Sequence, residues 1–323
     1  MAQENPNEIP VYMFYGFMDS GKTSMIRETL FDNGFADDIE RFLLIVCEDG
    51  DEEYDEKALN SIGGTLVMID KQEDFNEENL QKLTDAYKPE AVFVEYNGTW
   101  EVGPVYEMDG PKDWVIVQAI TTVDATTFEM YMKNMRTMMS EQLFKADVVI
   151  FNRCPNDVKK AKFRANVKSV NRACQIAYIR TDGSVDDTPE ELPFDLSKDT
   201  IDISDADYAL WFMDCMDHPK KYDGKKVHFL GLVYNPTEGK GKLKKGIFVP
   251  GRFAMTCCVE DIQFLGMKCK YDKAADIGHK SWIDLTATVK NEFATEYHGK
   301  GPVLYPVDIE PAEKPQDELV YFN

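Results

Sequence analysis

The chain of 323 residues lacks any apolar run of the roughly 20 residues that a membrane-spanning helix needs. Its N-terminal stretch, MAQENPNEIP, has neither the basic nor the apolar segment of a secretory signal. The seven cysteines are odd in number and show no spacing typical of a disulfide framework. We therefore expect reduced thiols, no membrane span and a cytoplasmic location.

Basic residues are scarce: 36 Lys and Arg stand against 58 Asp and Glu, giving a net charge of −22. From Lys220 onward the counts are 16 against 14, a net charge of +2, so the preceding part carries −24. Such an acidic surface argues against nucleic acid or an anionic membrane as the main partner. The length also favours two domains, and the nearly neutral tail behaves as a separate unit.

A phosphate-binding motif stands near the N-terminus. It follows Val11–Tyr15, an apolar run that predicts a buried parallel strand, and precedes Ser24–Leu30, which predicts a helix. The motif has the spacing G-x-x-x-x-G-K-T, with Gly16, Gly21, Lys22 and Thr23. Glycines let the backbone approach phosphates, and the N–H groups of the loop and of the helix N-terminus attract anions. A chance glycine turn with a surface lysine is the alternative; such a match arises about once in a hundred chains of this length.

In this interpretation Lys22 neutralises the β- and γ-phosphates and the Thr23 hydroxyl holds Mg²⁺. The nucleotide-binding residues expected in the loop are Gly16, Asp19, Ser20, Gly21, Lys22, Thr23 and Ser24.

Strands and helices alternate over about the next 150 residues, which predicts an α/β fold with a mostly parallel sheet. The expected strands are Arg41–Cys47, Thr65–Ile69, Ala91–Glu95, Trp114–Val123, Val148–Asn152 and Gln175–Ile179. The expected helices begin near Asp55 and span Glu77–Tyr87, Thr126–Lys145 and Asp157–Cys174.

Four polar residues lie at or just beyond strand ends: Glu48, Glu95, Asp124 and Asn152. Ligands bind beyond the carboxyl ends of parallel strands, so these residues and the glycine loop predict one site, although isolated caps or turn formers are the alternative. Glu95 is expected to bind Mg²⁺ directly or through water, and Gly98 to present its N–H to the γ-phosphate. A helix N-cap is the alternative for this segment, and Asn97 suits it better.

The order of these motifs resembles the CobW/HypB/UreG group of P-loop GTPases, especially its CobW-type branch, over about residues 10–183. The matching segments are Gly16–Thr23, Cys47–Gly50 with Asp55, Glu95 with Gly98, Val123–Ala125, Glu141–Gln142, Ala146–Asp147 and the base-reading segment Asn152–Pro155. The resemblance implies a Mg²⁺-dependent GTPase of low turnover that acts as a switch or chaperone in metal homeostasis or transport. It assigns Thr23, Asp55 and Glu95 to magnesium, Lys22, Glu48 and Asp55 to catalysis, and Asn152 and Arg153 to the base.

The chain departs from the family pattern at several positions. Asp19 replaces a glycine, Arg153 replaces a lysine, and Pro155 stands where a carboxylate pairs with guanine, with Asp157 two residues later. GTP against ATP therefore stays open. The Gly-Cys-x-Cys-Cys metal motif of the family is absent.

The later part predicts a linker and docking helix over 184–224 and a β-rich domain over 225–323, after a nucleotide-binding domain over 1–183. Short alternating strands favour a small OB-like β-barrel. The expected strands are Val227–Tyr234, Gly246–Pro250, Phe253–Val259, Ile262–Tyr271, Ser281–Lys290 and Pro302–Glu310. This part resembles an uncharacterised C-terminal domain of permease-associated bacterial membrane proteins, through Gly231–Tyr234, Gly251–Cys258, Trp282 and Tyr321.

Cys257 and Cys258, with Asp261 and either Cys269 or His279, form a candidate soft-metal site for an ion such as Zn²⁺. Buried structural cysteines are the alternative, because adjacent strand residues point to opposite faces. Candidate partners besides the nucleotide are a protein client, a permease or a second copy of the chain. Two rival functions remain: a P-loop kinase acting on a small molecule, and a non-hydrolysing regulatory scaffold.

Overall fold

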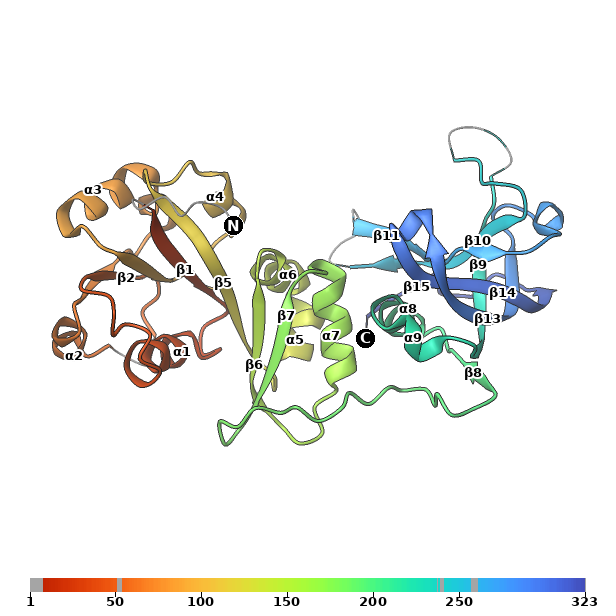
Figure 1. The fold of residues 1–323 in the computed structure, drawn as a ribbon, viewed down its shortest axis with the longest axis horizontal. Helices are drawn as coiled ribbons and strands as arrows, with labels where there is room; N and C mark the ends of the chain where they lie inside the picture. The colour runs from red at the N-terminus through yellow and green to blue at the C-terminus, as the bar shows by residue number, and fades with distance from the viewer. Residues whose placement is uncertain (1–7, 51–53, 237, 239–240, 257–260, 323) are drawn as a thin grey trace. The chain divides into compact units, whose positions relative to one another are not determined.

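The computed structural model describes residues 8–50, 54–236, 238, 241–256 and 261–322 (Figure 1). The chain forms two compact units. The first consists of Met1–Val158 and Val170–Thr188, and the second of Lys159–Ser169 and Pro189–Asn323.

The first unit is built on a seven-stranded sheet in which every pairing is parallel, so the predicted α/β fold with a parallel sheet is confirmed. The strand order is β3-β2-β4-β1-β5-β6-β7. The strands are β1 (Ile9–Tyr15), β2 (Phe42–Val46), β3 (Gly64–Met68), β4 (Ala91–Glu95), β5 (Trp114–Asp124), β6 (Val148–Cys154) and β7 (Gln175–Arg180). Strands β2 and β4 are buried at every residue, as expected for continuous apolar runs covered on both faces.

Helices cover both faces of this sheet (Figure 1). They are α1 (Lys22–Arg27), continued by a π-helix (Glu28–Asp32), α2 (Glu56–Ser61), α3 (Glu77–Tyr87), α4 (Gly103–Glu107), α5 (Phe128–Asn134) and α6 (Arg136–Phe144), with a 3₁₀ turn at Gln72–Asp74. Ile26 of α1 and Leu59 of α2 pack in one core with Phe14 of β1. Leu80 of α3 and Val105 of α4 pack in another core on the opposite face. The glycine loop therefore lies between a buried strand and a helix anchored to the sheet.

The prediction of one continuous helix over Thr126–Lys145 is wrong. Helix α5 ends and α6 begins around Met135, whose φ of −135° and ψ of 39° are not helical. Two side chains next to this break donate to backbone carbonyl oxygens: Asn134 to Met130 at 2.9 Å and Arg136 to Met132 at 3.1 Å. Polar side chains that satisfy the backbone locally compete with the helical hydrogen bonds, which accounts for the break.

The second unit contains a mixed eight-stranded sheet and three α-helices within the described residues. The helices are α7 (Lys160–Val170), α8 (Tyr208–Asp217) and α9 (Pro219–Tyr222), with 3₁₀ turns at Ala274–Asp276 and Thr295–Tyr297. The strands are β8 (Thr200–Asp202), β9 (Lys226–Tyr234), β10 (Ile247–Met255), β11 (Ile262–Gly266), β12 (Cys269–Lys270), β13 (Trp282–Ala294), β14 (Gly299–Pro311) and β15 (Leu319–Val320). The order is β11-β10-β12-β14-β13-β9-β8, and β10 also pairs with β9 and β15.

Two of the predicted strand boundaries in this unit are wrong. The segments Gly246–Pro250 and Phe253–Val259 belong to one strand, β10, up to Met255; residues 257–260 lie outside the described part. Strand β10 continues through Gly251, where a Cβ would lie 2.5 Å from the Leu265 carbonyl oxygen. The glycine therefore permits the close approach of β10 and β11. Conversely, the predicted strand Ile262–Tyr271 is divided into β11 and β12.

A buried charged network anchors α7 within the second unit. The Arg164 guanidinium lies 2.6 Å from Asp214, and 2.8 Å from both Asp217 and Glu190. Arg164 is 7% exposed and Asp214 is fully buried. Burial raises the pKa of Asp214, but hydrogen bonds from Tyr222 and Lys221 and the nearby cations outweigh it, so the pKa is lowered. The predicted docking helix, α8, lies in the core of this same unit.

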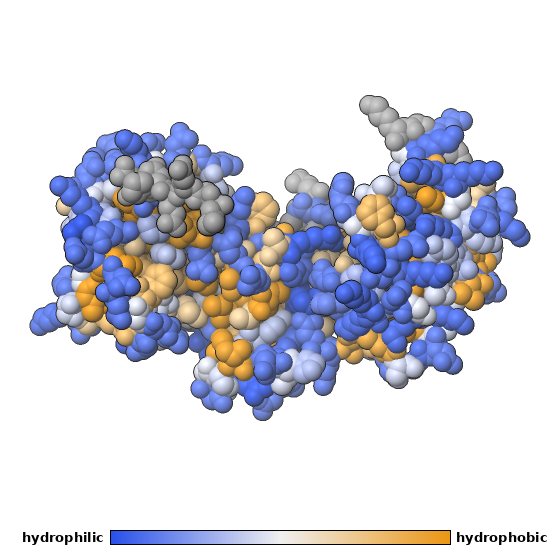
Figure 2. All heavy atoms as spheres, viewed as in Figure 1, coloured by the Kyte–Doolittle hydropathy of each residue, from blue (hydrophilic) through white to orange (hydrophobic). Residues whose placement is uncertain are grey.

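Hydrophilic residues cover most of the surface visible in Figure 2, with smaller apolar groups between them. Within the described part of the chain, none of the helices has both the length and the apolar character needed to cross a bilayer.

Candidate functional site

The loop between β1 and α1 has the backbone that its glycines predict. Gly16 and Gly21 have φ values of 129° and 99°. A Cβ at Gly16 would lie 2.2 Å from the Thr122 carbonyl oxygen, and one at Gly21 would lie 2.6 Å from Asn152 Nδ2. Side chains are therefore excluded at both positions by conformation and by space.

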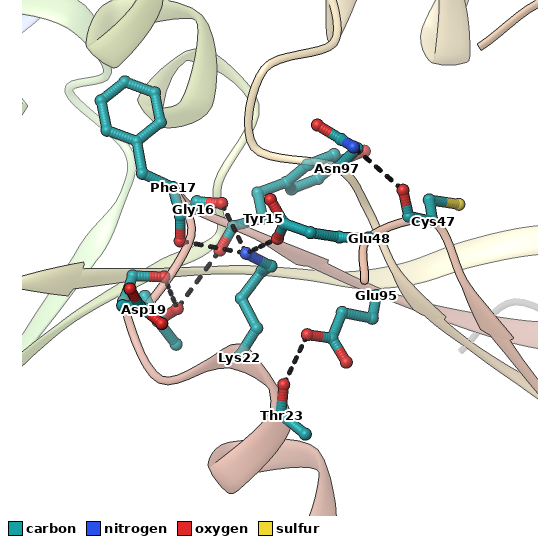
Figure 3. A network of polar contacts seen from close by, with 12 residues as sticks. Tyr15, Gly16, Phe17, Asp19, Lys22, Thr23, Cys47, Glu48, Glu95 and Asn97 are labelled. Atoms are coloured by element: carbon teal, nitrogen blue, oxygen red, sulfur yellow. Dashed lines mark hydrogen bonds and ion pairs between the residues drawn. The ribbon is translucent and has the colours of Figure 1, made fainter. Parts of the chain in front are cut away.

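Lys22 points into the loop and is 3% exposed (Figure 3). Its ammonium donates to the carbonyl oxygens of Gly16 at 2.9 Å and Phe17 at 3.0 Å. It also lies 2.5 Å from Glu48 Oε2. The other oxygen of Glu48, Oε1, is buried without a hydrogen-bond partner among the described residues. The structure thus joins two predicted site residues, Lys22 and Glu48, in a buried ion pair.

Glu95, at the end of β4, lies next to the start of α1 (Figure 3). Its Oε1 accepts a hydrogen bond from the Thr23 hydroxyl at 2.7 Å, and its Oε2 accepts one from the Tyr54 hydroxyl at 2.5 Å. Burial raises the pKa of Glu95, although the two hydroxyl groups and Lys22 act in the opposite direction. The predicted pair of Thr23 and Glu95 is therefore brought together, while Tyr54 was not predicted, because no motif marks it.

Two neighbouring cavities open over these groups, with volumes of about 190 Å³ and about 270 Å³. Thr23, Glu48, Gly50 and Glu95 line both of them. The first is also lined by the predicted residues Asp19, Gly21, Lys22, Ser24 and Arg153. A hollow with an ammonium, loop backbone and two carboxylates at its floor suits a phosphate chain with a hard cation.

Asp55 has a different place from the one expected. It is exposed and forms the N-cap of α2, accepting hydrogen bonds from the backbone N–H groups of Lys57 at 2.9 Å and Ala58 at 3.2 Å. It lines neither cavity, whereas Glu56 lines the second. The described geometry thus gives Asp55 a capping role and does not bring it together with Thr23 and Glu95.

Gly98 lies against the loop: a Cβ there would lie 2.4 Å from the Gly16 carbonyl oxygen and 2.6 Å from Phe17 Cα. The preceding Asn97 is not a helix N-cap. It donates to the Cys47 carbonyl oxygen at 3.0 Å and accepts from the Thr99 backbone N–H at 2.9 Å, which fixes the turn that carries Gly98.

The predicted base-reading residues lie near the end of β6 and contact the same loop. Asn152 Nδ2 donates to the Ser20 carbonyl oxygen at 2.9 Å. Arg153 donates to Asp124 at 2.8 Å and to the Asp19 carbonyl oxygen. Hydrogen bonds to its neighbours, chiefly Thr126 and Arg153, outweigh burial and lower the pKa of Asp124. The carboxyl ends of β5 and β6 therefore contact the glycine loop. This agrees with the expectation that the polar strand ends and the loop lie at one edge of the sheet.

Two further residues position the loop and were not predicted as site residues. Gln142 of α6 accepts a hydrogen bond from the Gly16 N–H at 3.1 Å and is 2% exposed. Thr122 of β5 shares a hydrogen bond of 2.7 Å with the Ser20 hydroxyl. The available sequence signals were weak: Gln142 belongs to a segment quoted for the family resemblance, and Thr122 is a polar residue inside an apolar strand.

The predicted soft-metal pair, Cys257 and Cys258, lies outside the described residues. Within the described part, no group of three or more His, Cys, Asp or Glu side chains is placed to hold a metal ion. Burial raises the pKa of the Cys269 thiol, and burial with the nearby Glu95 and Glu48 raises that of Cys47. Both thiols therefore favour the protonated form in the metal-free protein.

Comparison with known proteins gives two family matches that together cover almost the whole chain. The CobW/HypB/UreG nucleotide-binding domain matches residues 10–177, and a domain described as the DUF1980 C-terminal domain matches residues 178–322. No curated protein matches the sequence.

Among the solved structures with similar folds are two of YjiA and one of HypB. The Zn(II)-bound YjiA GTPase from E. coli is 20% identical, with a TM-score of 0.41, over 55% of this chain and 59% of that one. A triple mutant of the Zn(II)-bound YjiA GTPase has the same identity and coverage and a TM-score of 0.43. The hydrogenase maturation factor HypB from Archaeoglobus fulgidus is 15% identical, with a TM-score of 0.39, over 56% of this chain and 85% of that one. The chain thus spans about three-fifths of the length of the YjiA chains.

The glycine loop with Lys22 and Thr23 and the carboxylate at the end of β4 lie within the match over residues 10–177, which is more than half of the chain. By this match the chain belongs to the CobW/HypB/UreG family of P-loop GTPases, which is related to metallochaperone GTPases.

Proposed function

We propose that the first unit binds and hydrolyses GTP with Mg²⁺ at low turnover, as a switch in metal homeostasis or transport. The observation that carries this proposal is the hydrogen bond between Thr23 and Glu95 at the base of the loop that holds Lys22. A hydroxyl, a carboxylate and an ammonium converge from two elements on one cavity. This is the set of groups that positions a metal-bound triphosphate.

The donor set fits magnesium. Thr23 and Glu95 offer hydroxyl and carboxylate oxygens, the hard ligands that Mg²⁺ prefers, and the cavity provides space for water ligands. When bound, the ion would neutralise charge on the β- and γ-phosphates. Thr23 and Tyr54 both donate to Glu95 in the described structure, which leaves the lone pairs of the Thr23 oxygen and the remaining lone pairs of the carboxylate available to a cation or its water ligands.

The protein side of the reaction depends on Lys22 and its neighbours. Lys22 must exchange the Glu48 carboxylate and the loop carbonyl oxygens for phosphate oxygens, where it stabilises the charge that develops on the transferred group. Glu48, which lines the cavity, would thereby lose its partner, and its carboxylate could then orient an attacking water. The Gly98 N–H is close to the loop backbone and is the candidate contact of the γ-phosphate.

The test is calorimetric titration of GTP into the wild type and Lys22→Ala with Mg²⁺ present. We expect Lys22→Ala to lose measurable binding. The matched control is Lys82→Ala, which removes an exposed lysine that pairs with Glu78 in the same unit and should bind as the wild type does. Wild-type affinity in Lys22→Ala would remove the assignment.

Nucleotide choice and reaction type require a second experiment. Pro155 replaces the carboxylate expected to read guanine, which keeps ATP and a non-hydrolysing scaffold as competing outcomes. Product analysis with GTP and ATP, with and without small-molecule acceptors, separates a GTPase from an ATPase, a kinase and a scaffold. Release of inorganic phosphate from GTP alone is the expected result, and transfer to an acceptor or no turnover contradicts it.

For the second unit we propose an OB-like barrel that couples nucleotide state to a protein client or a permease. The strand pairings support it: the path β9-β10-β12-β14-β13 returns to β9, and β12 with β14 is its parallel step. Closure of this kind removes sheet edges. Crosslinking of the full chain in lysate, loaded with GDP or with a non-hydrolysable GTP analogue, is expected to capture a partner in one nucleotide state; identical capture in both contradicts the coupling.

A cytoplasmic location and a homodimer also belong to this proposal, and so does a Zn²⁺ site at Cys257 and Cys258. Equilibrium dialysis with Zn²⁺, Ni²⁺ and Co²⁺ on the wild type and on the double variant with both cysteines changed to serine tests the metal. A lower stoichiometry in the variant is expected, and an unchanged one ends the metal proposal.

A further inference from the structure

The second unit contains a cavity of about 560 Å³ that takes no part in the nucleotide site. Four aromatic side chains line it: Tyr234 at the end of β9, Phe253 of β10, Phe264 of β11 and Trp282 at the start of β13. Its volume lies within the range of about 300–1,000 Å³ found for small-molecule sites. Strands therefore supply all four of these aromatic side chains.

The aromatic rings form a continuous wall. The ring centroids of Phe253 and Phe264 are 5.2 Å apart, and those of Tyr234 and Phe264 are 6.2 Å apart. Tyr234 and Phe253 remain 38% and 39% exposed although they line a hollow. Exposed aromatic side chains that gather around a cavity leave apolar area in water that a ligand ring would cover, which distinguishes them from scattered surface residues.

The polar groups at this cavity are mostly cationic. Lys280 and Lys314 line it, and its one carboxylate within the described residues, Glu318, lies 2.5 Å from Lys314. The pocket therefore has an excess of positive charge in a chain whose net charge is −22. An anionic group on a ligand is the complement of this arrangement.

His279 adds a directed donor beside the aromatic wall. Its Nδ1 accepts a hydrogen bond from the Asn235 backbone N–H at 3.1 Å, so the neutral imidazole carries its proton on Nε2. The imidazole stands edge-on to Tyr234, with 5.5 Å between the centroids. A donor fixed in this way is oriented for an acceptor oxygen next to a bound ring.

We propose that this pocket binds a small organic anion in which a planar aromatic ring carries a carboxylate. The ring contacts Phe253, Phe264 and Tyr234, and the carboxylate lies between Lys280 and His279. Single-stranded nucleic acid also stacks on exposed aromatic side chains, but a cavity of about 560 Å³ has the size of a small-molecule site and not of a groove for a row of bases.

The experiment uses the full chain without nucleotide, so its result is independent of the GTPase proposal. Calorimetry or Trp fluorescence compares 2-naphthoate, 2-naphthylmethylamine, cyclohexanecarboxylate and a thymidine oligonucleotide as probes. We expect 2-naphthoate to bind at least tenfold more tightly than the amine, which has the opposite charge, and than cyclohexanecarboxylate, which lacks the flat ring. Equal binding of the amine, or preferential binding of the oligonucleotide, would overturn the proposal.

Variants locate the binding. Phe253→Leu keeps an apolar side chain of similar volume and should bind 2-naphthoate at least tenfold less tightly, and Lys280→Gln about fivefold less tightly. Phe293→Ala is the matched control, because Phe293 is 66% exposed on β13 and does not line the pocket. Thermal unfolding verifies that each variant is folded. Unchanged affinity in folded Phe253→Leu, or an equal loss in Phe293→Ala, would contradict the assignment.

Discussion

The Lys22 ammonium lies 2.5 Å from Glu48 Oε2, with both side chains about 95% or more buried (Figure 3). The Glu48 carboxylate thus supplies the negative charge beside Lys22 that a phosphate group of a nucleotide would supply. Nucleotide binding must break this ion pair. The free energy of the pair is therefore subtracted from the affinity for the nucleotide. Buried pairs lose much of their attraction to desolvation, but removing one partner leaves an uncompensated charge.

Glu48→Gln tests this relationship. The amide keeps the shape but not the charge, so we expect the unfolding free energy of the nucleotide-free protein to fall by about 3 kcal/mol. GTP binding should tighten by roughly tenfold, because phosphate would then relieve an unpaired lysine; this ratio corresponds to about 1.4 kcal/mol. Urea denaturation and calorimetry give the two quantities.

The matched control for this change is Glu90→Gln. Glu90 pairs with Arg41 at 2.8 Å, but both side chains are largely exposed. Its loss should cost less than about 1 kcal/mol and leave GTP affinity unchanged. Weaker GTP binding in Glu48→Gln would show that Glu48 assists the bound nucleotide and does not compete with it.

Magnesium binding should depend on pH through Glu95. Burial raises the pKa of this carboxyl, so the proton competes with the cation at a higher pH than for an ordinary glutamate. Lowering the pH from 8 towards 5.5 should therefore weaken Mg²⁺ binding to the GTP complex progressively. Titrations of Mg²⁺ against a fluorescent GTP analogue provide the measurement. In Glu95→Gln the remaining affinity should be low and independent of pH over this range; an identical pH profile in that variant would exclude Glu95.

Gly98→Ala should displace the glycine loop between β1 and α1, although Gly98 is not itself part of that loop. The added methyl would lie 2.4 Å from the Gly16 carbonyl oxygen, a backbone atom that cannot move without displacing the loop. We expect a loss of more than about 2 kcal/mol in unfolding free energy and at least tenfold weaker GTP binding. Gly103→Ala is the control, since nothing lies within 4 Å of its added Cβ. It should be neutral or stabilising by less than about 1 kcal/mol in urea denaturation.

How much of the fold and of the candidate site could be predicted from the sequence depends on how far apart in the sequence the interacting residues lie. The parallel sheet and the pairing of Thr23 with Glu95 followed from local patterns, because a glycine loop and an acid at a strand end have few other uses. The role of Tyr54 depends on how the chain returns to Glu95 over 41 residues, which no local pattern encodes. The place of Asp55 could not be read from the sequence, because a carboxylate just before a helix serves as an N-cap as readily as it serves as a metal ligand.

The second unit contains a pH-dependent contact at His228 of β9. Its ring nitrogens lie 3.1 Å from Asp202 and 2.5 Å from Asp284. Burial lowers the pKa of this histidine, but the hydrogen bonds and charges of the two aspartates outweigh it and raise the pKa. The folded state therefore binds the proton more tightly than the unfolded state does. The stabilisation is complete below the unfolded value of about 6.5 and is lost as the pH rises through the folded pKa.

Urea denaturation of the wild type and of His228→Gln between pH 5.5 and 9 measures how much His228 contributes to the free energy of unfolding. The difference should be largest at the acidic end, at up to about 1 kcal/mol because the site is partly exposed, and should shrink as the pH rises. Taking the difference removes the background from the other acidic groups. A gap that widens with pH would reverse the assigned direction.

Helix α7 has a consequence for dissecting the protein. The family match over residues 10–177 includes this helix, yet its core contacts and its Arg164 network belong to the second unit. A single cut after residue 177 would leave one fragment with a basic amphipathic helix whose buried face has lost its partners, and the other with a buried Asp214 that has lost the Arg164 guanidinium. The halves of this polypeptide are interleaved along the chain, so gene truncation at the domain boundary is expected to yield insoluble products, whereas a circular permutant that keeps α7 with its partners would not.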